Sequence, residues 1–260
     1  MTGIKTDNLI VTDLSIPSLN ATPNFSGGED GLMPYFIGHD IGAREIEMSI
    51  EIISVDYLDY SLLKNILYSI FPINEPFYIV DKRVPGIRHK VVLNGSFIPE
   101  RHNPINGTAV IPLLSDKPHY AESTLTTLDI NDKLEVDDSL SFGMGLLTDD
   151  ESHVYVHETE TFRIYNAGNV PVHPFEQMLN ITIEGASENY TLKNLTTGDE
   201  FKYTDDVTGT LRLQGPNITI NNLQALRHTN KEFITLAPGW NEFEQNQPCE
   251  ISFDFRFYYY

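Results

Sequence analysis

One segment of this sequence has the period of an amphipathic helix, and most of the rest alternates in polarity or breaks at turn residues. A helix buries a stripe of side chains three or four positions apart, whereas a strand buries every second one. Asp56 is placed to cap the helix and Pro72 to end it, so we expect a helix from Asp56 to Phe71. The side chains expected to pack on a sheet are Leu58, Leu62, Ile66 and Ile70, flanked by Leu63, Leu67 and Phe71.

Strand patterns surround this helix. In residues 44–53, four apolar side chains alternate with three glutamates and a serine, which predicts a strand with one apolar and one charged face. Asn94-Gly95 is a tight-turn signal, so we expect a hairpin whose return strand begins at Phe97-Ile98. The other strands expected in this half are 77–80, 87–93 and 108–114. The first 40 residues, rich in Pro and Gly, are expected to be an irregular arm.

The second half consists of short strand patterns separated by turn residues, with no helical period between them. This pattern is typical of an antiparallel β-sandwich. In the last segment, Ile251, Phe253, Phe255, Phe257 and Tyr259 share one face, so we expect a central strand. The expected strands are 154–156, 161–165, 178–184, 190–194, 200–203, 209–213, 217–220, 233–236 and 249–260.

Length and patterning together predict a mainly β protein of two domains. The chain has 260 residues and 40% hydrophobic residues, enough for a real core. An acidic stretch that contains glycine, residues 129–152, is the candidate junction. We place the first domain at residues 1–130 and the second at residues 131–260.

The formal net charge of −20 excludes several classes of partner. An acidic surface repels phosphate, so tight binding of nucleic acid or of anionic membranes has no electrostatic support. The single cysteine, Cys249, cannot form a disulfide within one chain. No signal peptide or membrane span is evident, and we expect maturation in a reducing cytoplasm.

Motifs for catalysis, nucleotides or metals are weak or missing, so we expect no catalytic residue, cofactor or metal. His153 and His157 flank a predicted strand, which would hold them about 13 Å apart, too far to share an ion. Acid pairs could serve a glycosidase, although adjacent acids in polar turns are usually just solvated. These acids are Asp137-Asp138, Asp149-Asp150-Glu151 and Asp205-Asp206.

Trp240, the sole tryptophan, leaves a second function open. Sugar-binding sandwiches often stack a sugar ring on Trp, so Trp240 is a possible sugar contact. The alternative interpretation is a structural anchor in the turn Pro238-Gly239-Trp240-Asn241.

The order of these pieces resembles a known family. The helix followed by Pro76-Phe77-Tyr78-Ile79-Val80-Asp81 and a hairpin resembles the N-terminal domain of distal tail proteins of long-tailed siphophages. The second half resembles the C-terminal domain of the same family through motifs in a fixed order. These are Asn166-Ala167-Gly168, Pro174, Ile181-Thr182-Ile183-Glu184-Gly185, Thr197-Gly198 and Pro238-Gly239-Trp240-Asn241. Each motif is common alone, and their order over nearly the whole chain is specific.

The resemblance implies a structural role in the virion. It implies a split-barrel-like N-terminal β domain that forms a homo-hexameric ring at the distal end of the tail, between the major tail tube protein and the tail-associated hub protein. It implies a galectin-like, carbohydrate-binding-module-like C-terminal sandwich, and contacts with the tape measure protein or with receptor-binding proteins. DNA would pass through the ring without specific binding. The alternatives are a protein that recognises host cell-wall polysaccharide and, on the acid pairs alone, a wall hydrolase.

Overall fold

The computed structural model describes residues 8–27, 33–131, 143–147 and 149–260. The chain divides into two compact units: unit 1 comprises residues 1–81 and 89–120, and unit 2 comprises residues 82–88 and 121–260. The fold is mainly β, as predicted. These units are defined by contacts within the folded chain, whereas the predicted boundary after residue 130 separates two domains that would fold independently. That boundary stays a prediction.

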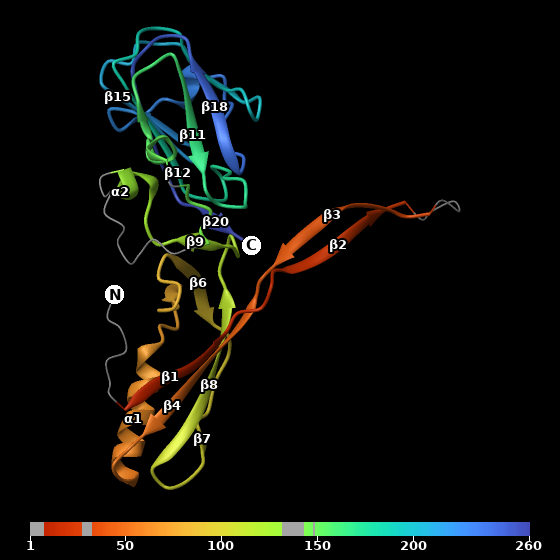
Figure 1. Cartoon of the computed structure of the whole chain (residues 1–260), viewed down its shortest axis with the longest axis vertical. Helices are drawn as coiled ribbons and strands as arrows, with labels where there is room; N and C mark the ends of the chain where they lie inside the picture. The colour runs from red at the N-terminus through yellow and green to blue at the C-terminus, as the bar shows by residue number, and fades with distance from the viewer. Residues whose placement is uncertain (1–7, 28–32, 132–142, 148) are drawn as a thin grey trace. The chain divides into compact units, whose positions relative to one another are not determined.

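Unit 1 is built on an antiparallel sheet with the strand order β1-β4-β8-β6 (Figure 1). Two short strands extend it, since β5 pairs with β6 and β7 pairs with β8. The strands are β1 (Leu9–Ser15), β4 (Glu45–Ile53), β5 (Phe77–Val80), β6 (Ile87–Leu93), β7 (Glu100–Arg101) and β8 (Asn106–Ser115).

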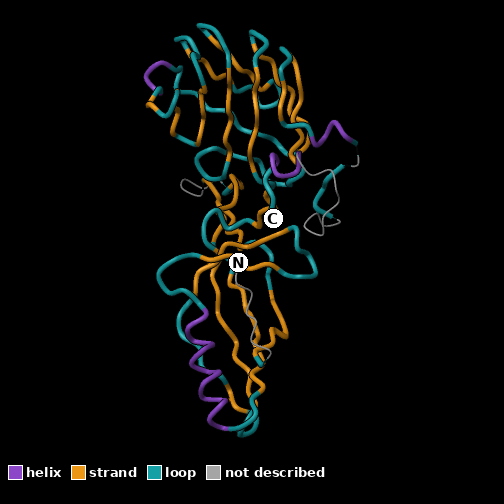
Figure 2. Tube along the Cα trace, turned by 90° about the vertical axis from the view of Figure 1, so that its left-hand side faces the viewer, coloured by secondary structure: helices purple, strands orange, loops and turns teal. Residues whose placement is uncertain are grey.

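One face of this sheet packs against helix α1 (Tyr57–Ile70), which runs beside the strands in Figure 2. On β4 the predicted apolar positions Ile46, Met48, Ile50 and Ile52 are buried, while Glu45 and Glu47 are exposed, so the predicted two-faced strand is confirmed. The cap of α1 is also confirmed, because Asp56 Oδ1 accepts from the amides of Leu58 and Asp59, both at 2.8 Å.

The predicted buried stripe of α1 is wrong in part. Leu63, Leu67 and Phe71 are buried as expected, but Leu58, Leu62 and Ile66 are 59%, 62% and 41% exposed. Tyr60 is buried instead, beneath the guanidinium of Arg101 at 4.2 Å from the ring centroid. The helix is apolar on more than one side, so helical spacing alone could not tell which apolar stripe faces the sheet.

The prediction of an irregular first arm is also wrong. The segment contains β1, which pairs with β4, and a hairpin of β2 (Asn20–Ser26) and β3 (Tyr35–Gly42). Pro17, Pro23 and the glycines had suggested turns. Pro23 instead lies within β2, where an edge strand tolerates its missing N–H.

The turn at Asn94-Gly95 does not lead directly into a return strand at Phe97-Ile98, so this prediction is wrong too. Residues 96–99 are irregular, and β6 pairs with the later strand β8. The Asn94 amide donates to Pro112 O at 2.9 Å, which closes the turn against β8.

Unit 2 contains a sandwich of two sheets. Their order is β10-β19-β12-β15-β16-β17 in one sheet and β11-β18-β13-β14 in the other, with antiparallel pairing throughout. Ring contacts join the inner faces, with Phe253 of β19 lying 4.9 Å from Phe243 of β18. The strands are β10 (Val156–His157), β11 (Thr161–Asn166), β12 (Leu179–Glu184), β13 (Tyr190–Asn194), β14 (Glu200–Tyr203), β15 (Thr210–Gln214), β16 (Asn217–Ile220), β17 (Leu223–Gln224), β18 (Gly239–Gln245) and β19 (Glu250–Phe255).

The turn motifs of this sandwich depend on buried asparagines. Asn241 Oδ1 accepts from the Ala237 amide, and its Nδ2 donates to Ala237 O, both at 2.8 Å. Asn166 Oδ1 accepts from the Gly168 amide. A Cβ on Gly168 would lie 2.6 Å from Tyr258 O, so only glycine fits there. The recurring Asn and Gly positions are therefore explained by the folding of the turns.

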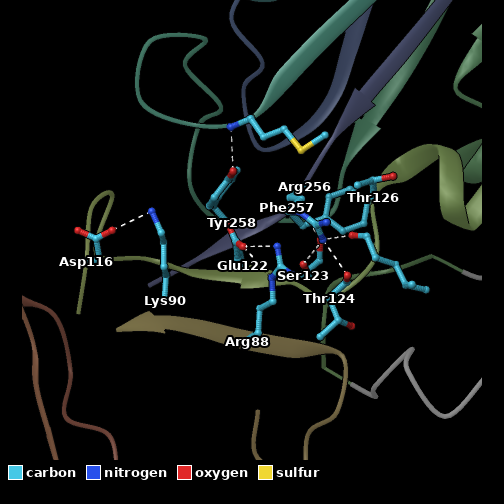
Figure 3. A network of polar contacts seen from close by, with 12 residues as sticks. Arg88, Lys90, Asp116, Glu122, Ser123, Thr124, Thr126, Arg256, Phe257 and Tyr258 are labelled. Atoms are coloured by element: carbon cyan, nitrogen blue, oxygen red, sulfur yellow. Dashed lines mark hydrogen bonds and ion pairs between the residues drawn. The ribbon is translucent and has the colours of Figure 1, made fainter. Parts of the chain in front are cut away.

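The first part of the last segment, β19, is central and buried as predicted, but the segment is two strands rather than one, and the second strand lies at the end of its sheet. β19 ends at Phe255, and β20 (Tyr258–Tyr259) pairs with β9 (Ala121–Ser123). Arg256 lies at the break and donates from Nη1 to the carbonyl oxygens of Ser123 and Thr124 (Figure 3).

Two further elements differ from the predicted ones. Residues 233–236 form no strand, and Leu236 makes only an isolated bridge to Val172. A second short helix, α2 (Thr127–Asn131), follows β9, and 3₁₀ helices lie at Asp150–His153 and Leu226–His228. Among the described residues, no helix is long and apolar enough to cross a membrane.

Candidate functional surfaces

The helix-free face of the unit 1 sheet is acidic. The glutamates of β4 point away from the side that packs on α1, because side chains alternate along a strand. Glu51 is opposite Thr108 on β8, and Glu100 on β7 is opposite the same Thr108, so both carboxylates are on this face. We call this the glutamate face; its acids are Asp13, Glu45, Glu47, Glu51 and Glu100.

None of these carboxylates has a basic cross-strand partner on β8; the base Lys90 of β6, which alternation with Val92 places on the same face, pairs with Asp116 at 2.8 Å. The partners on β8 that share the face are Thr108, Val110, Pro112 and Leu114. Arg101, adjacent to Glu100 in sequence, lies on the opposite side over the Tyr60 ring, and Arg44, adjacent to Glu45, is buried. The carboxylates are therefore not neutralised by their cross-strand neighbours, and the face repels a polyanion.

Trp240 lies near the start of β18, on the outer face of the four-stranded sheet. Strand pairing places it opposite Tyr165, with the ring centroids 5.0 Å apart. The guanidinium of Arg163 sits over the indole at 4.0 Å from its centroid, a cation–π arrangement. One face of the indole is thus covered by a side chain of the same sheet.

An ion pair holds Arg163 in this position. Its Nε and Nη2 both donate to the carboxylate of Glu151, in the fork geometry that suits a guanidinium. The hydrogen bonds to Arg163 lower the pKa of the Glu151 carboxyl, and the carboxylate raises the pKa of Arg163. The sequence singled out Glu151 only among the possible glycosidase acids and did not point to Arg163, because only the pairing of β11 with β18 brings position 163 to Trp240.

A groove of about 540 Å³ opens beside this cluster. The flat stack of His157 on Phe162, with centroids 4.6 Å apart, forms part of its wall. Burial lowers the pKa of His157, so its ring is neutral at pH 7 and packs as an aromatic. The polar lining consists of Glu151, Thr159, Thr161, Arg163 and Glu242.

Among the other acids singled out in the sequence, Asp149 and Asp205 have structural partners. Asp149 caps a 3₁₀ helix through the Ser152 amide, and Asp205 Oδ2 lies 2.7 Å from His228 Nδ1. The hydrogen bonds lower the pKa of Asp149, the reverse of the change that a general acid needs. Asp137-Asp138 fall outside the described residues. His153 ends a 3₁₀ helix, and no group of three potential metal-ligating acids, histidines or cysteines occurs among the described residues.

Comparisons with known proteins agree on one kind of relative. Residues 28–115 match the phage tail protein RIFT-related domain. The crystal structure of the Dit protein of phage SPP1, called a paradigm of the hub adsorption apparatus in phages that infect Gram-positive bacteria, matches with a TM-score of 0.69. The match has 12% sequence identity and covers 96% of this chain and 94% of that chain.

A chain of the phage p2 baseplate, in its activated conformation with strontium, matches at 12% identity with a TM-score of 0.43. It covers 96% of this chain and 90% of that chain. A search of curated protein sequences gives no match.

The resemblance read from the motif order is thereby confirmed. At 12% identity, the similarity to the SPP1 protein shows a shared fold over nearly the whole of both chains. Residues 28–115 thus resemble a phage tail protein domain, and the chain has the fold of the SPP1 Dit protein.

Proposed function

We propose that this protein forms a hexameric ring at the distal end of a phage tail, joining the tail tube to the hub and letting DNA pass through its centre. The observation that carries the proposal is the fold shared with the SPP1 Dit protein over nearly the full length of both chains. The major tail tube protein and the tail-associated hub protein are the proposed neighbours of the ring, and tape measure and receptor-binding proteins are further candidates.

The glutamate face supplies the physical basis for a DNA channel. Six copies of a chain with a formal charge of −20 carry a total of about −120. If the glutamate face of each copy lines the channel, DNA meets carboxylates without paired bases and slides without adhering. This orientation places α1, on the opposite face of the sheet, away from the channel.

The experiment is a mass measurement on the purified full chain by light scattering, combined with negative-stain microscopy. Six chains of 29.5 kDa give a particle of about 180 kDa with a central hole, or twice that mass if two rings pair. A chain that stays monomeric at high concentration, even beside its tail partners, would contradict the proposal.

A second candidate function is binding of host cell-wall polysaccharide by unit 2. The groove beside Arg163 favours it, because the groove combines an aromatic wall with hydroxyl and carboxylate groups suited to sugar hydroxyls. Trp240 adds one partly open indole beside this groove. Binding of the full chain to a panel of wall glycans, compared with Trp240→Ala, tests the proposal, and no binding to any glycan would remove it.

A further inference from the structure

The hairpin of β2 and β3 lacks any cover of its own. The two strands form a separate sheet without a third strand, and no side chain of either strand is buried. In Figure 1 the hairpin continues the β1–β4 ribbon beyond the other strands of unit 1. A two-stranded hairpin is at best marginally stable in water, so this one needs another surface to stabilise it.

Aromatic and aliphatic side chains gather on this hairpin. Phe25 and Phe36 meet edge to face with their centroids 6.0 Å apart, and His39 packs on Phe36 at 4.8 Å. Among its described residues, 20–27 and 33–42, the only acidic or basic side chains are His39 and Asp40. Exposed apolar side chains gathered in this way mark an interaction site. The side chains more than half exposed are Phe25, Met33, Tyr35, Phe36 and Ile37.

A second uncharged surface lies on the outer side of α1. At 100° per residue, Leu58 and Leu62 point away from the buried Leu63 and Leu67. Ser61, Asn65 and Ser69 complete this side, while Asp59 and Lys64 lie toward its flanks. We call it the outer face of α1; its exposed apolar side chains are Tyr57, Leu58, Leu62, Ile66 and Tyr68.

Charge decides which molecule can cover these two surfaces. Two copies of a chain with a net charge of −20 repel each other, so they associate best where carboxylates do not face carboxylates. The glutamate face fails this requirement, whereas the hairpin and the outer face of α1 meet it. A ribbon and a helix differ in shape, and a contact between two different surfaces of identical chains runs head to tail and can close into a ring.

We propose that the hairpin of one copy packs its aromatic side chains on the outer face of α1 of the next copy. This inference rests on the proposed ring and names the contact that builds it. Each copy then supplies one hairpin and accepts one hairpin, and every copy in a closed ring has both surfaces covered. The contact needs no cofactor and leaves the glutamate face free.

Photo-crosslinking of the full chain tests this contact directly. A benzophenone amino acid at position 36 should crosslink between copies, and mass spectrometry should find the bond within residues 57–70. The matched control is the same probe at Val110, a 48% exposed side chain on the glutamate face of the sheet, opposite the face that packs on α1, so it should not reach that helix. Rings whose crosslinks from position 36 fall elsewhere would overturn the inference and leave the proposed ring intact.

Mixing two variants tests the head-to-tail geometry. Phe36→Ser with Ile37→Ser removes the hairpin surface, and Leu58→Ser with Leu62→Ser removes the helix surface. Each variant alone should raise the concentration needed for ring formation at least about tenfold, since buried apolar anchors dominate interfaces. Mixed one to one, they should give a heterodimer, because one hairpin and one intact α1 face remain to pair.

The controls keep the two proposals separable. All four substituted side chains are exposed, so far-UV circular dichroism and the melting temperature should stay near the wild-type values. Val110→Ser should assemble like the wild type. A helix variant that still forms wild-type rings would refute this contact alone, whereas a wild-type chain that never assembles and shows no crosslink would refute both the contact and the ring.

Discussion

The two units differ in how completely they cover their apolar side chains. Unit 2 closes its sandwich with stacked rings and buried asparagines, and few of its large hydrophobic side chains are exposed. Unit 1 is the smaller unit, yet it holds most of the exposed large hydrophobic side chains among the described residues. The difference indicates that unit 2 is complete as a monomer, whereas unit 1 is shaped for contacts that only other molecules supply.

Replacing Phe by Ala in each unit should give the largest difference between a buried and an exposed aromatic side chain. Phe253→Ala removes a fully buried ring of the sandwich and should lower the free energy of unfolding by about 3–5 kcal/mol. Phe36→Ala, on the exposed hairpin, should change it by less than about 0.5 kcal/mol while it impairs assembly. Urea denaturation below the assembly concentration, followed by circular dichroism, measures both, and equal costs would show that the two regions are equally buried.

How far the sequence predicted each unit follows from the same difference. In the sandwich, strands such as β12 and β13 alternate because one face is buried, so their bounds were predicted to within one residue. In the hairpin, no residue of β2 or β3 is buried, so burial imposed no alternation that could reveal the strands. An alternating polar and apolar pattern arises from burial within one chain. It cannot reveal a strand whose apolar side chains contact another molecule.

The candidate surfaces were predictable only in part, for a related reason. The alternating glutamates of β4 were visible in the sequence, but Glu100 joins them only through the register of β7 on β8. Arg163 and Glu151 likewise reach Trp240 through strand pairing over long sequence separations. The residue types predicted the chemistry of each surface, whereas the strand register decides which residues lie on it.

Acid should weaken unit 1 through His89. Burial first, and the charge of Arg44 second, lower the pKa of His89 from 6.5 to about 4. The unfolded chain therefore binds a proton at a higher pH than the folded chain, and stability falls as the pH drops from about 6.5 to 4. The full loss is about 3 kcal/mol, because each pKa unit corresponds to 1.36 kcal/mol.

Urea midpoints at pH 7 and pH 5 measure this loss, with His89→Gln as the test variant. The variant should show a smaller change in midpoint between the two pH values than the wild type. His102→Gln, at an exposed position of the same unit, serves as the control and should keep the wild-type slope. If His89→Gln shows the same change in midpoint between pH 7 and pH 5 as the wild type, another group causes the loss of stability in acid.

The smallest expected effect concerns the outer face of the sandwich. Arg163→Ala removes the cation from over Trp240 and should cost about 0.5–1 kcal/mol, the usual value for an exposed cation–π pair. Because Trp240 is the only tryptophan, its emission reports this site alone, and loss of the covering side chain should shift the emission to longer wavelength. Lys202→Ala, an exposed cation on the same sheet, should leave the spectrum unchanged.

This measurement also bears on sugar binding. A sugar ring stacks on an open indole face, and Arg163 occupies one face of Trp240 through its bond to Glu151. If unit 2 binds wall glycan by displacing Arg163, then Arg163→Ala should tighten binding while Trp240→Ala abolishes it. If both variants bind glycan as the wild type does, Trp240 is a structural anchor of the sheet and does not contact the sugar.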